Sequence, residues 1–360
     1  MSRSAGRLTA GVAVCVAAVV CAAVPLPEDV VERWFSLAWY PLVQRVLTPA
    51  TNLLPLAVLD GLIVVALAGV TAWALGAWRA TRQGGWVGFG SHVGWLVVAT
   101  AALYLVFLTC WGFNYQRIPM SSRLVLDGDP PDAAAVEQLG LDAAARLNEL
   151  WPAARTTDGD IEPWRNAPLR AAFDEVQRAL SEAPPATPGR LKQTMLGPYF
   201  TWVSVDGMIN PFGLEVLANP EILPFERPFV AAHEWAHLAG YADESEANFV
   251  GWLTCLRAAP LAQYSGWLHV FSQVSGALGA GAAGRMSDAL DPGPRADLAA
   301  IGARVRASRI PALSTRSWQV YDRYLRANRV PGGVRNYGAV VTLILQTRFE
   351  DGWRPVRRPR

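Results

Sequence analysis

Long apolar runs occupy the first third of the chain and predict membrane helices. Residues 53–78 contain one acidic residue, and residues 93–113 carry no charge. A bilayer core needs about 20 such residues in a helix, so both runs are predicted to cross a membrane. Residues 8–24 form a shorter apolar run behind Arg3 and Arg7. This run fits a retained anchor or a cleavable signal peptide, and the two spans that follow favour the anchor.

Beyond residue 117 the apolar positions recur at helical spacing instead of in long runs. The helices predicted from this pattern cover residues 132–150, 166–182, 228–239, 243–258 and most of 261–347. Residues 266–284 are apolar but include His269 and other polar residues, which favours a buried helix over a fourth span. The chain therefore divides into a membrane region, residues 1–117, and one mainly α-helical domain, residues 118–360.

Strand-like patterning is scarce in this domain. The best candidate is GLEVLAN, residues 213–219, which lies between Pro211 and Pro220. A strand and a loop capped by the two prolines both fit this segment.

The composition narrows the range of partners. Charged residues make up 17% of the chain, against about 25% in a typical soluble protein. The net charge is only +2, and no Lys/Arg run is interleaved with aromatic residues, so a nucleic-acid partner is not expected. The four cysteines include no C-x-x-C pair, which argues against a disulfide framework and a cysteine zinc site. A lipid bilayer is the expected surrounding.

Basic residues predict how the chain is oriented in that bilayer. Arg3 and Arg7 precede the first run, and Arg79 and Arg82 lie between the second and third. The positive-inside rule places these positions in the cytoplasm. Three crossings would then leave everything after about residue 114 outside the cytoplasm.

The sequence AAHEWAHLAGYADESEANFVGWL, residues 231–253, contains the most informative motif. His233 and His237 are four residues apart, so on a helix they lie on one face, one turn apart. Both imidazoles can then reach a single zinc ion at roughly 2.0–2.1 Å. Glu234 lies beside the pair, where it can take a proton from a water on that zinc. Two solvated surface histidines are the plain alternative, but the apolar flanks and a helix-ending Gly240 favour a buried metal-binding helix.

A catalytic zinc also needs a third protein ligand and one open position. Glu244 and Glu246 are the candidates. On a helix, Glu244 shares a face with Asn248 and Gly251, which allows close packing and lets Asn248 orient a ligating imidazole. Glu246 and Asp243 fit the two ends of a D-x-x-E capping box instead. We therefore predict Glu244 as the ligand, with Glu246 as the alternative.

The motif H-E-x-x-H followed by E-x-x-A-N resembles the gluzincin pattern of zinc metallopeptidases, in which a glutamate on the next helix is the third ligand. The chain resembles still more closely a bacterial family catalogued as domain of unknown function 3810, in the stretches GMINPFGLEVLAN, PFVAAHEWAHLAGYADESEANFVGWL and VYDRYLRANRVPGGVRNYGAVVTLIL. Its members carry N-terminal transmembrane helices ahead of a predicted zincin domain. Many gluzincins have an aspartate at the position of Asn248, so this chain lacks one charge there.

The resemblance implies a fold and further site residues. We expect three N-terminal transmembrane helices, then a zincin-like α+β domain with a small edge sheet. The edge strand that binds an extended peptide would consist of Leu214, Glu215, Val216, Leu217, Ala218 and Asn219. Candidate donors to the oxyanion of the transition state are Tyr324, Arg335 and Tyr337, although each is also an ordinary packing or surface residue type.

The expected function is a zinc-dependent peptidase anchored in the bacterial cell membrane. It would bind one zinc ion per chain, use Glu234 as general base and take peptide or protein as substrate. The alternative is a non-catalytic sensor or binding module that keeps the zinc fold. An intramembrane protease is not expected, because the residues around the motif include six charges.

The orientation can be tested with reporter fusions. Because the basic residues flank the predicted cytoplasmic ends, alkaline phosphatase fused after residue 120 should be active, and a fluorescent protein fused there should stay dark. A fusion that fluoresces in the cytoplasm would reverse the predicted orientation.

Overall fold

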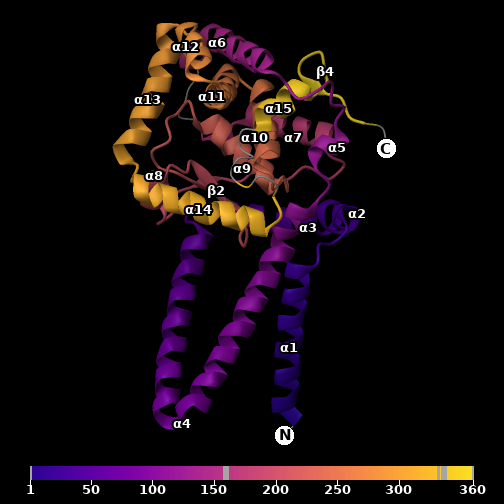
Figure 1. Ribbon diagram of the computed structural model, residues 1–360, viewed down its shortest axis with the longest axis vertical. Helices are drawn as coiled ribbons and strands as arrows, with labels where there is room; N and C mark the ends of the chain where they lie inside the picture. The colour runs from indigo at the N-terminus through magenta and orange to yellow at the C-terminus, as the bar shows by residue number, and fades with distance from the viewer. Residues whose placement is uncertain (1, 157–161, 331–332, 334–338, 359–360) are drawn as a thin grey trace.

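Long helical arms extend from one side of a mainly helical head in the computed structural model (Figure 1). The structure describes residues 2–156, 162–330, 333 and 339–358. Helix α1 (Ser2–Ala23) is one arm, and α4 (Val58–Cys110) supplies two more, which meet at the end farthest from the head.

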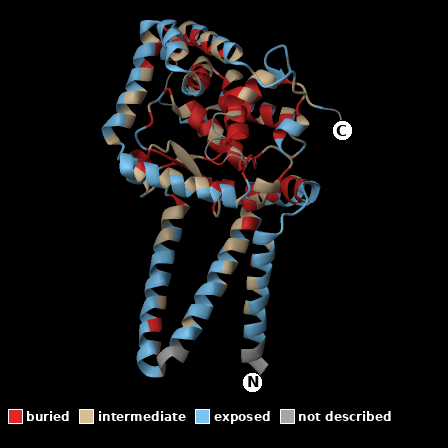
Figure 2. Ribbon diagram, in the orientation of Figure 1, coloured by how far each residue is buried: buried red, intermediate tan, exposed pale blue. Residues whose placement is uncertain are grey.

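Two segments of α4 have the length and composition of membrane spans. Val58–Gln83 and Phe89–Cys110 are both long and apolar enough to cross a membrane. A third crossing results if the bent pair Leu8–Ala23 and Glu28–Asn52 is taken as one span. Most described side chains of the arms are exposed (Figure 2), as lipid-facing side chains would be. The predicted membrane-length helices are therefore confirmed for two segments, and the first begins at residue 58.

The head is built mainly from helices. The segment between the first arm and α4 forms α2 (Glu28–Val30), the π-helical η1 (Val31–Trp39) and α3 (Tyr40–Asn52). After α4 follow the short helices η2 (Gly112–Gln116) and α5 (Met120–Arg123). The remaining helices are α6 (Ala133–Thr156), η3 (Pro163–Arg165), α7 (Ala167–Leu180), α8 (Gly197–Val203), α9 (Arg227–Leu238), α10 (Glu244–Leu256), α11 (Pro260–Ala277), α12 (Ala280–Asp288), α13 (Pro292–Ser308), α14 (Pro311–Ala327) and α15 (Ala339–Gln346).

Helices α9 and α10 form the centre of the head (Figures 1 and 2). Every residue of α10 from Glu244 to Cys255 is buried, as expected of a helix that is covered on all sides. The two helices pack closely because Gly251 has no side chain. A Cβ atom there would lie 3.1 Å from the backbone nitrogen of His233. The predicted helix over residues 266–284 is instead two helices, α11, which packs in the head with many buried residues, and the mostly exposed α12, and neither is among the membrane-length helices.

The head includes residues that precede the predicted boundary at 118. Val31, Phe35 and Tyr40, from η1 and the start of α3, belong to the same buried cluster as α9 and α10. Trp111, directly after α4, belongs to it too. The described head therefore consists of the predicted domain together with the segments on both sides of α4.

A three-stranded sheet lies beside the central helices, in the order β1 (Leu191–Lys192), β3 (Glu215–Ala218), β2 (Gly207–Asn210). Strand β3 pairs in parallel with β1 and antiparallel with β2, and all four of its residues are buried. Of the predicted strand, residues 214–219, the structure has Glu215–Ala218 as a strand, but the predicted position at the sheet edge is wrong. Strands β1 and β2 are the two edge strands, and β2 is the one that lies against Glu234. A second small sheet joins β4 (Phe349–Glu350) and β5 (Arg354–Pro355).

A buried ion pair joins this sheet to the start of α4. The Glu215 carboxylate lies 2.8 Å from Nζ of Lys192, and neither side chain is exposed. It also accepts hydrogen bonds from the backbone N–H groups of Val58 and Leu59 and from Asn210 Nδ2. Burial alone would raise the pKa of Glu215, but these donors lower it. The carboxylate therefore caps the first turn of α4.

Removing the Glu215 charge should destabilise the head strongly. Glu215→Gln leaves Lys192 buried without its partner, which should lower the free energy of unfolding by roughly 3–5 kcal/mol. The matched control is Glu149→Gln, in the exposed pair with Arg146, whose side chains are 64% and 53% exposed. That change should cost less than about 1 kcal/mol. Denaturant unfolding of the full chain in detergent measures both, and equal losses would contradict the capping role.

Candidate metal centre

The end of α9 is shaped by a turn that also orients one histidine. Gly240 has φ +85°, and the N–H groups of Gly240 and Tyr241 donate to the carbonyls of His237 and Ala236. This is the Schellman pattern, which favours glycine because of the positive φ. The turn brings the Tyr241 carbonyl 2.7 Å from Nδ1 of His237. Nε2 of His237 is thereby directed toward α10.

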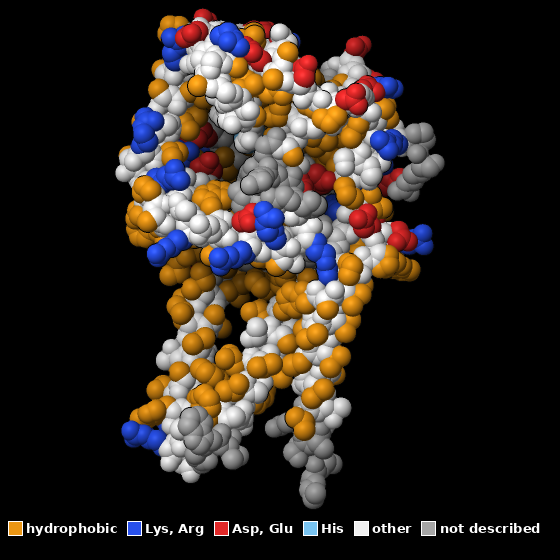
Figure 3. Space-filling model, viewed as in Figure 1, with side chains coloured by type: hydrophobic (Ala, Val, Ile, Leu, Met, Phe, Trp, Pro, Cys, Tyr) orange, Lys and Arg blue, Asp and Glu red, His pale blue; other side chains and the backbone are white. Residues whose placement is uncertain are grey.

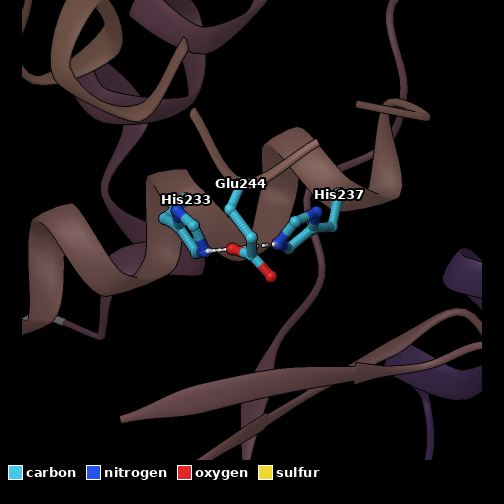
Figure 4. Close-up of side chains that lie close together, drawn as sticks. All are labelled: His233, His237 and Glu244. Carbon is cyan, nitrogen blue, oxygen red and sulfur yellow. Dashed lines mark ion pairs between the residues drawn. The ribbon is translucent and has the colours of Figure 1, made fainter. Parts of the chain in front are cut away.

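Three side chains converge where α9 and α10 meet (Figure 4). Glu244 Oε2 lies 3.4 Å from Nε2 of His233 and 3.4 Å from Nε2 of His237. The possible ligand atoms of these three residues all lie within 4.8 Å of one another. Ligands held at about 2.1 Å in a tetrahedral arrangement lie about 3.4 Å apart. The cluster therefore has the spacing of a three-ligand metal site.

The start of α10 decides which carboxylate joins the cluster. Asp243 caps the helix, as predicted, and accepts hydrogen bonds from the backbone N–H groups of Ser245 and Glu246. Helix phase then turns Glu244 toward α9 and Glu246 away from it. Glu246 Oε1 accepts a hydrogen bond from the backbone N–H of Met120 at 2.5 Å. The predicted role of Glu246 in a capping box is thus corrected, because its carboxylate binds the segment that follows α4.

Tyr321 on α14 also contacts the cluster, and sequence reasoning missed it. Its hydroxyl donates a hydrogen bond to Glu244 Oε1 at 2.6 Å. Ser314 and Leu325, the two buried positions of α14, lie on the same side of the helix as Tyr321, so a helical projection of residues 311–327 would have pointed to it.

Of the three predicted oxyanion donors, Tyr324 alone lies among the described residues. Tyr324 lines the cavity beside the cluster, and Tyr115 donates a hydrogen bond to its hydroxyl at 3.5 Å. Arg335 and Tyr337 lie outside the described residues.

Asn248 does not orient an imidazole as predicted. It is 2% exposed, and its Nδ2 atom has no hydrogen-bond partner among the described residues. Nδ1 of His233 also has none. The contact that fixes a ring is instead the Tyr241 carbonyl at His237. The ring of His269 stacks on Phe229, with 3.8 Å between the ring centroids.

Glu234 lies next to the cluster under the edge strand. It is 3% exposed, and its Oε2 atom has no partner among the described residues. A Cβ atom on Gly207 in β2 would lie 2.7 Å from Glu234 Oε1, so only glycine allows this approach. Burial raises the pKa of Glu234 above its ordinary value.

The histidines of the cluster keep Glu244 charged despite its burial. Burial alone would raise the pKa of Glu244, but His237 and His233 lower it well below its ordinary value. Burial alone would lower the pKa of His237, but Glu244 raises it to about 9. Glu244 is therefore ionised at neutral pH, as a metal-ligating carboxylate must be.

A cleft passes over the cluster. One cavity of about 350 Å³ and one of about 360 Å³ lie on either side, and both are lined by His233, Glu234 and Gly207. The first also contacts His237, Glu244 and Met208 of the edge strand. The cluster thus forms the floor at the middle of the cleft.

Comparison with known proteins identifies the family. A family model described as "Protein of unknown function (DUF3810)" matches residues 35–345. The chain belongs to this family. The match begins in η1 and ends in α15, so it includes both segments of α4, the sheet and the metal-site residues. No curated protein and no solved structure matches the chain.

The two neighbouring glutamates should respond differently to substitution. Glu244→Ala removes one of the three converging ligand atoms and should weaken zinc affinity by well over tenfold. Glu246→Ala leaves the Met120 N–H buried without an acceptor, which should cost about 1–3 kcal/mol of stability but leave zinc affinity unchanged. Zinc titration and unfolding of both variants in the full chain measure these effects. Loss of zinc binding in Glu246→Ala alone would contradict the assignment.

Proposed function

We propose that this protein is a membrane-anchored, zinc-dependent peptidase with a zincin-like head. The observation that carries the proposal is the Glu234 carboxylate, buried and with a free oxygen beside three converging ligand atoms, on the floor of a cleft with an open strand edge. A purely structural metal site would need no such carboxylate.

The residues fit zinc in both chemistry and spacing. Two imidazoles and one carboxylate form the His₂Glu set of catalytic zinc sites, which leaves a fourth position open. His233, His237 and Glu244 would hold the ion. Zinc bound there would polarise the scissile carbonyl and lower the pKa of the attacking water. The Tyr241 carbonyl at His237 and the Tyr321 hydroxyl at Glu244 would keep these ligands oriented.

Glu234 would be the general base. Its raised pKa suits a group that takes a proton from the attacking water and passes it to the leaving amine. Its Oε2 atom is available because no described residue binds it. Gly207 keeps β2 close enough to exclude bulk water from one side of the carboxylate.

The free edge of β2 would hold the substrate. An extended peptide can add to an unpaired strand edge through backbone hydrogen bonds, with alternate side chains entering pockets. Residues 207–210 take this role in place of the predicted 214–219, because β3 is paired on both sides. The two cavities would receive the side chains on either side of the scissile bond.

The proposed location is the bacterial cell membrane, with the head outside the cytoplasm. This orientation is supported by the arginines near the N-terminus and between the two segments of α4. The head lies at the opposite end of the arms from those arginine-bearing positions (Figure 1).

Three single variants should distinguish the residues that bind zinc from the residue that is needed only for hydrolysis. The full chain should contain one zinc ion, and His233→Ala or His237→Ala should abolish its binding because two ligands cannot hold it tightly. Glu234→Gln should keep the zinc and lower hydrolysis at least about 100-fold, the usual contribution of a general base. Elemental analysis and cleavage of mixed-sequence quenched fluorescent peptides provide the measurements.

Two results would contradict the proposal at different steps. A folded wild-type chain without affinity for zinc would rule out the metal centre. A zinc-loaded wild type that cleaves no peptide, with Glu234→Gln indistinguishable from it, would favour the sensor or binding module.

A further inference from the structure

One end of the cleft lies against the last turn of the membrane-length helix. Trp111 and Tyr115 line the cavity of about 350 Å³. Trp111 directly follows Cys110, the last residue of α4, and Tyr115 lies four residues further on, in η2. Phe107, within that last turn, packs against Phe212 and Tyr324, with ring centroids 6.4 Å apart in each case. The wall of this cavity is therefore continuous with a helix that is apolar enough to cross a bilayer. We call this cavity the aromatic cavity.

Exposed apolar side chains lie on the head surface near the aromatic cavity. Helix α14 lies across the base of the head, above the two segments of α4 (Figure 1). Large hydrophobic side chains near it are exposed, including Trp202 on α8, Ile310 before α14 and Val320 on α14, which is 64% exposed. Such a patch on a soluble surface marks an interaction site, and tryptophan favours the membrane interface.

Basic residues surround this apolar surface. Between residues 305 and 330 the chain has one acidic residue, Asp322, and six arginines, Arg306, Arg309, Arg316, Arg323, Arg326 and Arg329. All six are exposed. Figure 3 shows a row of basic side chains along the lower rim of the head, directly above the apolar arms. Arg329 donates a hydrogen bond to the carbonyl of Ala22 at the end of α1, which sets this rim at the level where the arms leave the head. That charge complements anionic lipid headgroups.

The cavity at the other end of the cleft has more polar side chains in its lining. The cavity of about 360 Å³ is lined by polar side chains such as Asp206, Asn248 and Gln273 beside apolar ones such as Phe229 and Ile301. It extends toward α11 and α13, away from the arms (Figure 1). The lining thus becomes more polar from the end of the cleft at the arms to the end within the head.

We propose that the substrate is the membrane-adjacent stretch of a polypeptide that is itself anchored in the bilayer. This inference rests on the proposed peptidase function and adds the substrate class. The stretch emerges from the lipid beside α14 and places apolar side chains in the aromatic cavity. It then continues along β2 toward the second, more polar cavity. The exposed apolar side chains of α8 and α14 lie in the lipid interface, with the arginines at headgroup level.

The position of cleavage tests the inference. The full chain is reconstituted with zinc in vesicles of phosphatidylcholine and phosphatidylglycerol. The probe is a mixed-sequence peptide tail joined to an apolar helix of about 20 leucine and alanine residues, long enough to span the bilayer. Mass spectrometry should find cuts mainly within about five residues of the apolar helix, because an extended chain advances only about 3.3 Å per residue. The control is a soluble peptide with the same tail but no apolar helix. It reveals any preference for cleavage position that does not depend on the anchor.

Three outcomes would reject the proposed substrate class, and the first of them would leave the proposed peptidase function intact. Cuts spread evenly along the tail, or only far from the helix, would reject the substrate class but keep the peptidase. Hydrolysis of the vesicle lipid in place of the peptide would reject both in favour of a lipid substrate. Failure to cut either peptide would reject both as well.

A labelling experiment gives an answer that does not depend on activity. In full chains with Cys15, Cys21 and Cys110 replaced by alanine, an environment-sensitive fluorophore is attached at Val320→Cys. The matched control is Ser287→Cys on α12, at the end of the head farthest from the arms (Figure 1). Lipid-borne quenchers should quench the label at 320 at least fivefold more than the label at 287. Equal quenching would show that α14 does not touch the bilayer.

Discussion

The carbonyl groups at the end of the histidine helix are bound by residues from the membrane-proximal segments. A helix end leaves its last carbonyls without partners inside the helix. Here Trp111 Nε1 donates to the His237 carbonyl, the Tyr40 hydroxyl to that of Leu238, and Arg117 Nη1 to that of Gly240. The arginine also places a positive charge at the negative end of the helix dipole. The helix that bears the candidate ligands is thus held by segments on both sides of α4.

The second helix of the site depends on the same region. Met120, ten residues after α4, donates its backbone N–H to Glu246 on α10. At the other end of α4, Glu215 joins the first turn to the sheet that supplies the edge strand. A head cut at residue 118 would lose the carbonyl partners of α9 and expose part of the buried cluster. The metal centre should therefore be studied in the full chain.

Features that depend on local geometry could be predicted from the sequence. The spacing of His233 and His237, the cap at Asp243 and the glycine at the end of α9 each follow from interactions within one or two turns. Because Asp243 fixes where α10 begins, it also fixes the phase that separates Glu244 from Glu246. The helix positions and the membrane-length segments were predictable for the same reason, since periodicity and hydrophobicity are local properties.

Features that depend on distant partners were missed or misplaced. Glu246 fits a capping box by its spacing, yet its partner Met120 lies 126 residues away. Tyr321 reaches Glu244 from a helix 77 residues further on. Strand β3 was expected at the edge because its sequence does not show that β1 pairs with its other side. Strand order is set by such long-range pairing, and a run of four buried residues fits a central strand better than an edge strand.

Two buried carboxylates in this head show how environment assigns opposite roles to one chemical group. Glu215 is enclosed by Lys192, Asn210 and two backbone N–H groups, which keep it charged despite its burial. Glu234 is nearly as buried, but no donor to its Oε2 atom lies among the residues that the structure describes, and burial raises its pKa. The first arrangement stabilises the charge and so fixes the fold. The second leaves a carboxylate that gains by accepting a proton, which is the property that the proposed general base requires.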